Sequence, residues 1–322
     1  MKLLVTGGAG YIGSHIVLEA LDSGFEVTVF DDLSSGTKEN IPEGVQFFQG
    51  STLSISDLST LFKLNKYNAV VHLAASKAAG ESMLEPEKYA QNNIIGGINL
   101  INACCESKVK TFVFSSSAAV YGSPKYNPID EQHPISPNNY YGQTKLHIEE
   151  SLEWFSNLKG IKYASLRYFN AAGYDKKKRI KSLEINPQNL IPAVMESAIG
   201  MRTHLEVYGN DYNTKDGTGV RDYVHVSDLV RAHIDSIKYI RKENKNLTIN
   251  LENEIGYSVL GIIIKLSEIS RKRIEYRFFR RRSGDSATKI ANAELAKRLI
   301  GWKTRYSDSD TIINSTWEIY KI

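Results

Sequence analysis

Cysteine is scarce in this sequence, long apolar runs are absent from it, and its net charge is small. The two cysteines, Cys104 and Cys105, are adjacent, so they provide neither a disulfide framework nor the spacing of a metal site. No apolar run approaches the roughly 20 residues that span a bilayer. A net charge of +4 is too small to indicate a nucleic-acid partner. We therefore expect no metal, no nucleic acid and no membrane among its partners.

The length and composition are those of a soluble globular protein. The chain has 322 residues, of which 42% are hydrophobic and 24% charged, and this allows one large or two moderate domains. The chain enters a strand at its second residue, so we expect no signal peptide. Together with the cysteine usage, this predicts a cytoplasmic protein. We find no internal repeat.

The first residues combine a strand, a glycine loop and a helix. The apolar strand 2–6 leads into GGAGYIG at residues 7–13, and residues 14–21 have helical apolar spacing. This is the arrangement of a dinucleotide-binding fold, in which the glycines allow close approach of a pyrophosphate to a helix N-terminus. The next strand ends in Asp31 and Asp32, where an acid would bind the adenosine ribose. Two acids would repel a 2′-phosphate, which favours NAD over NADP.

A tyrosine and a lysine stand four residues apart in the segment YGQTK. On a helix, Tyr141 and Lys145 would share one face. An ammonium close to a phenol favours the phenolate and can lower its pKa by about 1–3 units. The pair therefore predicts a tyrosine that acts as a general base near neutral pH.

Strands and helices alternate through the first half of the chain. Short apolar strands are predicted at residues 45–49, 69–74, 111–116 and 163–168. This pattern predicts an α/β fold with a doubly wound parallel (Rossmann) sheet, which binds ligands beyond the carboxyl ends of its strands. We expect an NAD-binding domain over residues 1–170. Residues 171–322 are predicted to form a smaller α/β substrate-binding domain, some segments of which pack back on the first.

Polar residues follow several of these strands. A serine in the segment SSSAAVYG at residues 115–122 could hydrogen-bond a substrate oxygen while Tyr141 removes its proton. Lys77 could reach the cofactor's phosphates or ribose. His72 lies among apolar residues and is predicted to be a satisfied core histidine. Asn92 and Asn93 open a helical pattern, which is also typical of capping.

Together these motifs resemble the extended short-chain dehydrogenase/reductase superfamily and, within it, the UDP-glucose 4-epimerases. The similarity runs from Met1 to about Asp310. The glycine loop and the Tyr–Lys pair are typical of the whole superfamily. Two segments of the second half are more specific, YGNDYNTKDGTGVRDYVHV at residues 208–226 and RRSGD at residues 281–285.

The resemblance implies a role for each matching position. Ser117 and Tyr141 match the catalytic serine and base, with Lys145 beside them. The residues expected to bind NAD are Gly7, Gly10, Tyr11, Ile12, Asp31, Asp32, Lys77, Asn93, Tyr141, Lys145 and Tyr168. Those expected to bind a UDP sugar are Ser117, Asn170, Asn189, Leu190, Tyr208, Arg221, Arg282 and Asp285. The arginines suit a diphosphate, because guanidinium groups pair with phosphate oxygens in good geometry.

The resemblance also implies an activity and an assembly. UDP-galactose and UDP-glucose would interconvert through a transient 4-keto sugar, with NAD tightly bound and no net redox change. Family members often form dimers through a bundle of helices, so we expect a homodimer.

Three positions depart from the family pattern. Ser51 stands where an acid usually lies near the adenine. Ala119 stands where a second hydroxyl is common. Lys289 stands where the size of the residue controls room for a 2-acetamido group, and its flexible stem can bend aside.

Other functions stay open on the sequence. A 4-epimerase of UDP-N-acetylhexosamines or of another UDP sugar is the main alternative. Nucleotide-sugar dehydratases and related decarboxylases place acids beside the serine, where this chain has Ala118 and Ala119. A non-catalytic NAD-binding regulator would not need Ser117, Tyr141 and Lys145.

Overall fold

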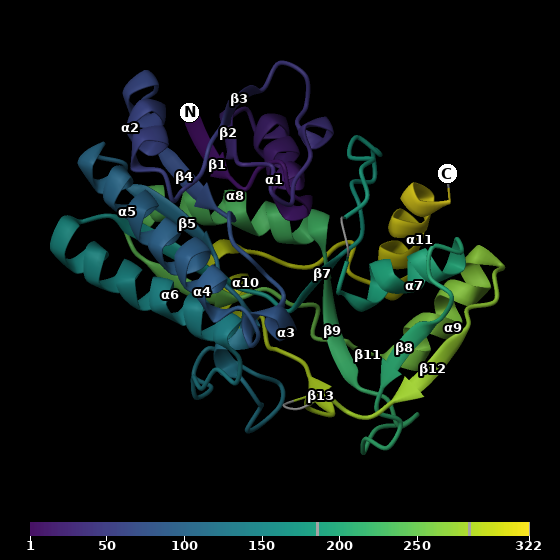
Figure 1. Ribbon diagram of the computed structural model, residues 1–322. Coiled ribbons are helices and arrows are strands. Elements are labelled where there is room, and N and C mark those ends of the chain that lie inside the picture. The colour runs from purple at the N-terminus through teal and green to yellow at the C-terminus, as the bar shows by residue number, and fades with distance from the viewer. Residues whose placement is uncertain (185–186, 283–284, 322) are drawn as a thin grey trace.

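The computed structural model describes residues 1–184, 187–282 and 285–321, and it has two parts, each with its own sheet and helices (Figure 1). Ser283 and Gly284, in the RRSGD motif, lie outside the described residues. The N-terminal strand lies in the larger part, and the last helix lies in the smaller one.

The larger part is built on a parallel sheet. Within the described residues it has seven strands in the order β10-β6-β5-β4-β1-β2-β3. Their bounds are β1 (Lys2–Thr6), β2 (Glu26–Asp31), β3 (Gln46–Gln49), β4 (Ala69–His72), β5 (Thr111–Ser115), β6 (Lys162–Arg167) and β10 (Leu247–Asn250). The predicted doubly wound parallel sheet is confirmed. The strand order reverses beside β1, so the glycine loop lies at the switch point where such sheets bind ligands.

Helices cover both faces of this sheet. One face carries α1 (Tyr11–Asp22), α8 (Val226–Glu243) and α10 (Glu294–Ile300). The other carries α2 (Ile55–Leu64), α5 (Gly96–Glu106) and α6 (Tyr140–Lys159). Shorter elements are η1 (Lys38–Asn40), α3 (Ala79–Ser82), α4 (Pro86–Tyr89), the π-helix η2 (Ala90–Ile95) and η3 (Ala118–Tyr121). Because both faces are covered, the inner strands β1, β4 and β5 are buried along almost their whole length rather than at alternate residues.

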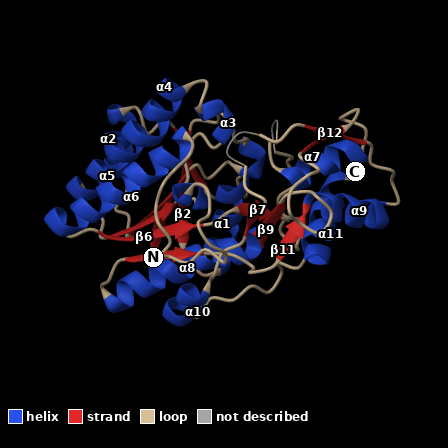
Figure 2. Ribbon diagram, turned by 90° about the horizontal axis from the view of Figure 1, so that it is seen from below, coloured by secondary structure: helices blue, strands red, loops and turns tan. Residues whose placement is uncertain are grey.

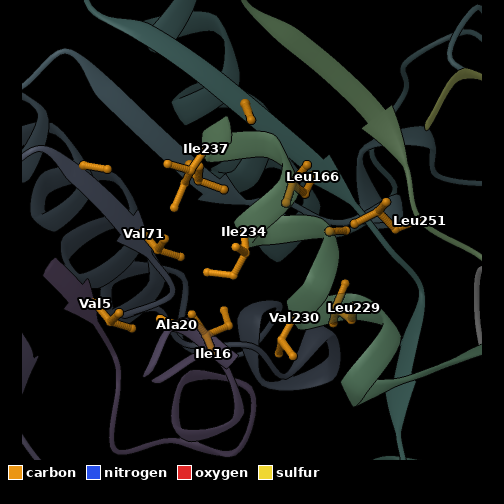
Figure 3. Packing of buried hydrophobic residues seen from close by; sticks show 14 of the residues in the cluster. Val5, Ile16, Ala20, Val71, Leu166, Leu229, Val230, Ile234, Ile237 and Leu251 are labelled. Atoms are coloured by element: carbon orange, nitrogen blue, oxygen red, sulfur yellow. The ribbon is translucent and has the colours of Figure 1, made fainter. Parts of the chain in front are cut away.

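Figure 3 shows the core between the sheet and its first helical layer. Ile16 and Ala20 of α1 and Ile234 of α8 lie over Val5 and Val71 of the strands, and all five are buried. Burying such aliphatic side chains stabilises the fold by roughly 1.5–3 kcal/mol each for valine and isoleucine. This packing fixes α1, and with it the glycine loop, against the sheet.

The smaller part has a sheet of its own. In the described residues its strands are β7 (Asn170–Ala172), β9 (Val220–His225), β11 (Gly256–Ser258) and β13 (Thr288–Lys289), with β9 paired to each of the others. A separate pair consists of β8 (Leu205–Tyr208) and β12 (Tyr276–Phe279). The helices α7 (Leu190–Ala198), α9 (Val259–Ser270) and α11 (Ser309–Tyr320) enclose a second core.

The chain crosses between the two parts more than once, and Figure 2 shows their helices as two groups. Helix α8 and strand β10 come after residue 170 in the sequence, yet they belong to the layers of the large sheet. Strand β9 runs directly into α8, so the smaller sheet is joined to the larger part by continuous structure. None of the described helices is both long and apolar enough to cross a membrane.

Candidate active site

The glycine loop joins β1 to α1 at the carboxyl edge of the large sheet. A Cβ atom on Gly7 would lie 2.6 Å from the backbone nitrogen of Ala74, and one on Gly13 would lie 2.0 Å from the carbonyl oxygen of Gly7. Gly7 also has a φ of 75°, which favours glycine. Gly10 caps α1 without a side-chain hydrogen bond in the described part of the chain. The N–H groups of the first turn therefore remain for an anionic ligand such as a pyrophosphate.

Asp31 holds the glycine loop against the end of β2. Its buried carboxylate accepts hydrogen bonds from the backbone N–H groups of Ala9 at 2.9 Å and Leu33 at 2.8 Å. Burial raises the pKa of Asp31, and repulsion from Asp32 acts in the same direction. Asp32 is exposed and accepts the N–H of Ser34 at 2.9 Å. The two acids expected at the ribose thus have different surroundings. Asp31 supports the glycine loop, whereas Asp32 faces solvent.

Tyr11 links the two parts of the molecule. Its hydroxyl donates to the carbonyl oxygen of Gly173, and its ring packs beside His15 and Tyr174. Burial raises the pKa of Tyr11 well above its ordinary value. The side chain is thus engaged by protein, which leaves the backbone N–H in the first turn of α1 as the group that can meet a phosphate. Ile12 packs partly buried against the core.

Asn93 ties three segments together beyond β4. Its side-chain oxygen accepts the N–H of Ser76 at 2.8 Å, and its amide donates to the carbonyl oxygen of Ser76 and the hydroxyl of Thr144, both at 3.0 Å. It lies in η2, and π-helical turns are frequent at functional sites. Its role in the described structure is tethering rather than capping.

Lys77 and His72 flank the same strand end. The ammonium of Lys77 pairs with Glu184 of the smaller part, and the lysine side chain is 60% exposed. The prediction that His72 is a core histidine is confirmed, because it is buried and bonds Thr6 at 2.8 Å. Burial lowers the pKa of His72 to about 3, so it is neutral at physiological pH.

Helix α6 brings Tyr141 to Ser117. The side chain of Asn139 accepts the N–H of Gly142 at 2.8 Å and so starts the helix just before Tyr141. Ser117 caps η3 after β5, and its side chain lies near enough to the phenol of Tyr141 to lower the pKa of that phenol. The carboxyl end of β5 and the first turn of α6 therefore place the serine and the phenol side by side, as the resemblance implies.

The predicted lowering of the Tyr141 pKa is wrong for this structure. Burial raises the pKa of Tyr141, although the hydrogen bond from Ser117 opposes the rise. Lys145 donates instead to the carbonyl oxygen of Ser115 at 2.8 Å, and its nitrogen lies 5.8 Å from the centre of the Tyr141 ring. Burial also lowers the pKa of Lys145 to about 7. The helical spacing was right, but both groups lie in a poorly solvated interior that disfavours their charged forms.

The sequence reasoning did not include Glu149, which follows Lys145 by one further helical turn. Its buried carboxylate accepts Nε of Arg167 at 3.0 Å and also binds Ser116. The negative charge of Glu149 raises the pKa of Lys145 against the effect of burial. The spacing 141, 145, 149 places all three on one face of α6, and that pattern could have identified Glu149.

Tyr168 completes this group at the end of β6. Its carbonyl oxygen accepts the N–H of Ala118 at 3.1 Å, and its ring lies edge-on to His233. Burial raises the pKa of Tyr168, repulsion from Tyr141 adds to this, and a hydrogen bond from Ser115 opposes it. Ser117, Tyr141, Lys145 and Tyr168 thus form one connected cluster.

A second cluster lies in the sheet of the smaller part. Arg221 on β9 bonds the carbonyl oxygen of Val220 at 2.9 Å, and its guanidinium lies 3.5 Å from the carboxylate of Asp285. Lys289 on β13 pairs with Arg221 in register. Burial lowers the pKa of Lys289 to about 8, and repulsion from Arg221 adds to this. Two cations beside one another suit a ligand with several negative charges.

The other predicted nucleotide contacts lie on other elements of the smaller part. The guanidinium carbon of Arg282 lies 3.8 Å from the ring centre of Tyr208, an arrangement typical of cation–π contact. The side-chain amide of Asn170 donates to the carbonyl oxygen of Asp222 at 2.8 Å. Asn189 caps α7 and is exposed, and Leu190 is the first residue of that helix. Among the described residues, no group of His, Cys, Asp and Glu could hold a metal ion.

Residues 3–251 match the model of the NAD dependent epimerase/dehydratase family. The chain belongs to this family. It is 40% identical over 321 residues to the UDP-glucose 4-epimerase of Halalkalibacterium halodurans, with 100% of this chain and 96% of that protein covered. The resemblance inferred from the motifs is therefore confirmed.

Solved structures of the family agree over the whole chain. The UDP-glucose 4-epimerase of Brucella ovis in complex with NAD has a TM-score of 0.96 at 37% identity, covering 99% of this chain and 98% of that one. The enzyme of Bifidobacterium longum in complex with NAD+ and UDP has a TM-score of 0.94 at 34% identity, covering 100% and 98%.

Two of the departures from the family pattern have a local explanation. The N–H of Ser51 donates to the carboxylate of Asp57 at 3.1 Å, so an acid from α2 lies at the turn where the family usually has one. Ala119 packs against the start of α6, because a Cβ atom on Gly142 would lie 2.6 Å from the carbonyl oxygen of Ala119. Its N–H donates to the hydroxyl of Ser117 at 3.1 Å. The serine is thus oriented by backbone rather than by a second hydroxyl.

The glycine loop makes a prediction about stability. Gly13→Ala forces its Cβ against the carbonyl oxygen of Gly7, so we expect the free energy of unfolding to fall by about 1–3 kcal/mol or more. Gly10→Ala is the matched control, because its Cβ would lie 3.4 Å from that same oxygen. Its change should stay within about 0.5 kcal/mol. Chemical denaturation checks both, and equal stability of the two variants would contradict the close packing.

Proposed function

We propose that this protein is a UDP-glucose 4-epimerase that uses tightly bound NAD to interconvert UDP-galactose and UDP-glucose. The observation that carries the proposal is the placement of Ser117 beside the phenol of Tyr141, one helical turn from the buried Lys145. It supplies a paired hydroxyl and phenol at the carboxyl edge of a sheet whose glycine loop fits a dinucleotide. The membership in the family and the similarity to named epimerases support the same activity.

NAD fits the residues at this edge. The first turn of α1 offers free N–H groups for its pyrophosphate, and the close backbone packing at Gly7 and Gly13 holds that turn at the carboxyl edge of the sheet. As the resemblance implies, we assign Asp31 and Asp32 to its adenosine ribose, and Lys77, Asn93 and Tyr168 to its nicotinamide and the adjoining ribose. When bound, NAD accepts a hydride from carbon 4′ of the sugar and returns it to the opposite face.

Tyr141 is the general base in this proposal. Its phenolate takes the proton of the sugar 4′-hydroxyl while Ser117 holds the 4′-oxygen by a hydrogen bond. The carbon–hydrogen bond at carbon 4′ breaks as the carbonyl forms, and the 4-keto sugar stays in the pocket. After the sugar turns over, Tyr141 returns the proton to the 4′-oxygen. No net oxidation occurs, because the same hydride and proton are given back.

Lys145 and the buried charges around it set the acidity of this site. In the structure burial raises the pKa of Tyr141 and lowers the pKa of Lys145 to about 7. A hydrogen bond from Lys145 to a bound ribose, together with the positive charge of oxidised nicotinamide, would favour the phenolate. Glu149 supports this step by favouring the ammonium form of Lys145.

The nucleotide half of the substrate belongs to the smaller part of the molecule. Arg221 and Arg282 pair with the diphosphate, and Tyr208 and Asp285 position these two guanidinium groups. Asn170, Asn189 and Leu190 complete the contact from β7 and the start of α7. The diphosphate anchors the substrate while its hexose end rotates.

Dehydration is disfavoured by the residues beside the serine. Elimination of water needs an acid there, and this chain has the apolar Ala118 and Ala119.

We place the protein in the cytoplasm, where a buried free thiol such as that of Cys104 stays reduced.

Replacing Tyr141 by phenylalanine tests the reaction. General base catalysis contributes about 10²–10⁴-fold to a rate, so we expect turnover of UDP-galactose to fall by at least about 10²-fold while NAD stays bound. Tyr140→Phe is the control, since it removes the neighbouring phenol and should leave turnover within about twofold. A coupled assay for UDP-glucose and the absorbance of retained cofactor measure both. A nearly active Tyr141→Phe variant would overturn the proposed role.

Lys289 is expected to decide between acetylated and non-acetylated sugars. Its half-buried side chain lies beside Arg221, so we expect faster conversion of UDP-galactose than of UDP-N-acetylgalactosamine without added NAD. Lys289→Ser should raise the relative rate on the acetylated sugar by about tenfold. Lys297→Ser on α10 is the control. An unchanged ratio of the two rates would remove Lys289 from this role.

The assembly is proposed to be a homodimer through α5 and α6. Trp154 is 66% exposed and Leu158 is 71% exposed, and their spacing places them on one face of α6. Ile95 precedes α5 and is 50% exposed. An apolar surface of this kind on two neighbouring helices suits a second copy of the chain.

Charged residues on this face should separate the dimer. We expect Trp154→Glu with Leu158→Glu to shift the mass in sedimentation equilibrium from two chains to one, because two charges would be buried without partners. Leu64→Glu on α2 changes a residue of similar exposure, 64%, and should leave the mass unchanged. A monomeric wild-type chain would contradict the proposed dimer.

A further inference from the structure

Two buried carboxyl groups lie beneath the nucleotide half of the candidate site. Asp222 follows Arg221 on β9 and is 0% exposed, and Glu252 follows β10 and is 1% exposed. The two strands come from different sheets, so these residues stand where the larger and smaller parts of the molecule meet. The roles assigned above involve neither of them.

Each carboxyl group holds backbone from another segment. Asp222 accepts the N–H groups of Asn253 at 3.1 Å and Glu254 at 3.0 Å. Glu252 accepts the N–H of Phe169, between β6 and β7. The remaining oxygen of Glu252, Oε2, is buried and has no hydrogen-bond partner in the described part of the chain. A buried carboxylate oxygen without a donor is costly, whereas a protonated oxygen in that place is uncharged.

The described part of the chain supplies no cation to this pair. Among the described residues, neither Asp222 nor Glu252 forms an ion pair with a lysine, arginine or histidine. The guanidinium of Arg167 on β6 is bound by Glu149, and that of Arg221 faces Asp285. The other carboxylates nearby are also engaged by backbone, since Glu254 accepts the N–H of Ala293 at 2.8 Å and Glu131 accepts that of Asn250 at 2.7 Å.

Burial and the repulsion between the two carboxylates therefore both raise the pKa values of this pair. Burial raises the pKa of Glu252 well above the usual carboxyl range, and the charge of Asp222 raises it further. Burial also raises the pKa of Asp222, although its backbone hydrogen bonds oppose the rise. Two carboxyl groups that repel each other in this way lose their protons as a coupled pair rather than independently.

We propose that Asp222 and Glu252 together keep one proton at neutral pH, and that this protonated pair holds the β6–β7 corner against β9. Glu252 is thereby a positioning residue for the nucleotide half of the substrate. The inference rests on the proposed function, because Asn170 and Arg221 are there assigned to the nucleotide. Asn170 follows Phe169 and binds the carbonyl oxygen of Asp222 at 2.8 Å, and Arg221 precedes Asp222. Full ionisation of the pair would drive these two segments apart.

The sign of the pH dependence follows from these pKa directions. Both folded-state pKa values lie above those of the unfolded chain, so the folded chain binds more protons once the pH exceeds the usual carboxyl range. The free energy of unfolding then falls as the pH rises toward the folded-state values. The affinity for UDP should fall as the pair ionises, by up to about tenfold per pH unit for the release of one proton.

Calorimetric titration with UDP between about pH 6 and pH 9 tests the proposal on wild type, Glu252→Gln and Glu254→Gln. Glutamine keeps the shape and cannot ionise, so Glu252→Gln should bind UDP like wild type near pH 6 and lose the decline above it. Glu254→Gln changes the neighbouring glutamate and should follow the wild-type profile. Ionisation of the terminal phosphate of UDP is common to all three proteins and cancels in the ratios.

Two outcomes would overturn the inference alone. One is a Glu252→Gln profile that declines in parallel with wild type, and the other is weak UDP binding by Glu252→Gln at every pH. A wild-type chain that binds no UDP would overturn the proposed function as well. If Glu252→Gln does not fold, infrared difference spectra of the wild-type holoenzyme replace it. A protonated carboxyl band that disappears above neutral pH supports the shared proton, and its absence at pH 6 overturns it.

Discussion

The close crossing of β1 and α1 at Gly7 and Gly13 is the constraint on which the rest of the candidate site depends. At these positions backbone takes the space that a side chain would need, so the loop packs directly against the end of β4. Asp31 fixes the loop from the β2 side by accepting the backbone N–H of Ala9. Once this crossing is in place, the ends of β4, β5 and β6 must open toward the same edge of the sheet, because all of these strands are parallel.

Low solvation gives that edge its chemistry. Burial disfavours the phenolate form of Tyr141 and the ammonium form of Lys145. The buried negative charge of Glu149 favours the ammonium form of Lys145. Burial acts in the same way on Asp222 and Glu252, where it disfavours the ionised carboxylates. The pKa values of these groups therefore depend on burial and on whether a charged partner is buried beside them, rather than on the type of side chain alone. A bound ligand that brings charge into the edge would change several of these groups together.

Much of the fold could be predicted from local pattern. The strand at residues 2–6, the glycine loop and the helix after it follow from apolar periodicity and from glycine geometry, and the structure has them at nearly the expected bounds. The core position of His72 was also readable from its apolar neighbours. Strand β10 was harder to predict as part of the large sheet, because it comes from the second half of the chain and each of its residues pairs with a β6 residue 83 positions earlier. Its place is set by packing rather than by local sequence.

By itself, the sequence determined the fold class, the glycine loop and the placement of Tyr141 and Lys145 on one helix face, because these depend on backbone geometry and on neighbours within a few residues. Only the tertiary structure decided the direction of the Tyr141 pKa, the partner of Lys145 and the meeting of Asp222 with Glu252. Each of these depends on desolvation by segments distant in the sequence. A periodic pattern predicts which face of a helix or strand is buried, but it does not predict which charged groups from distant segments will be buried beside one another.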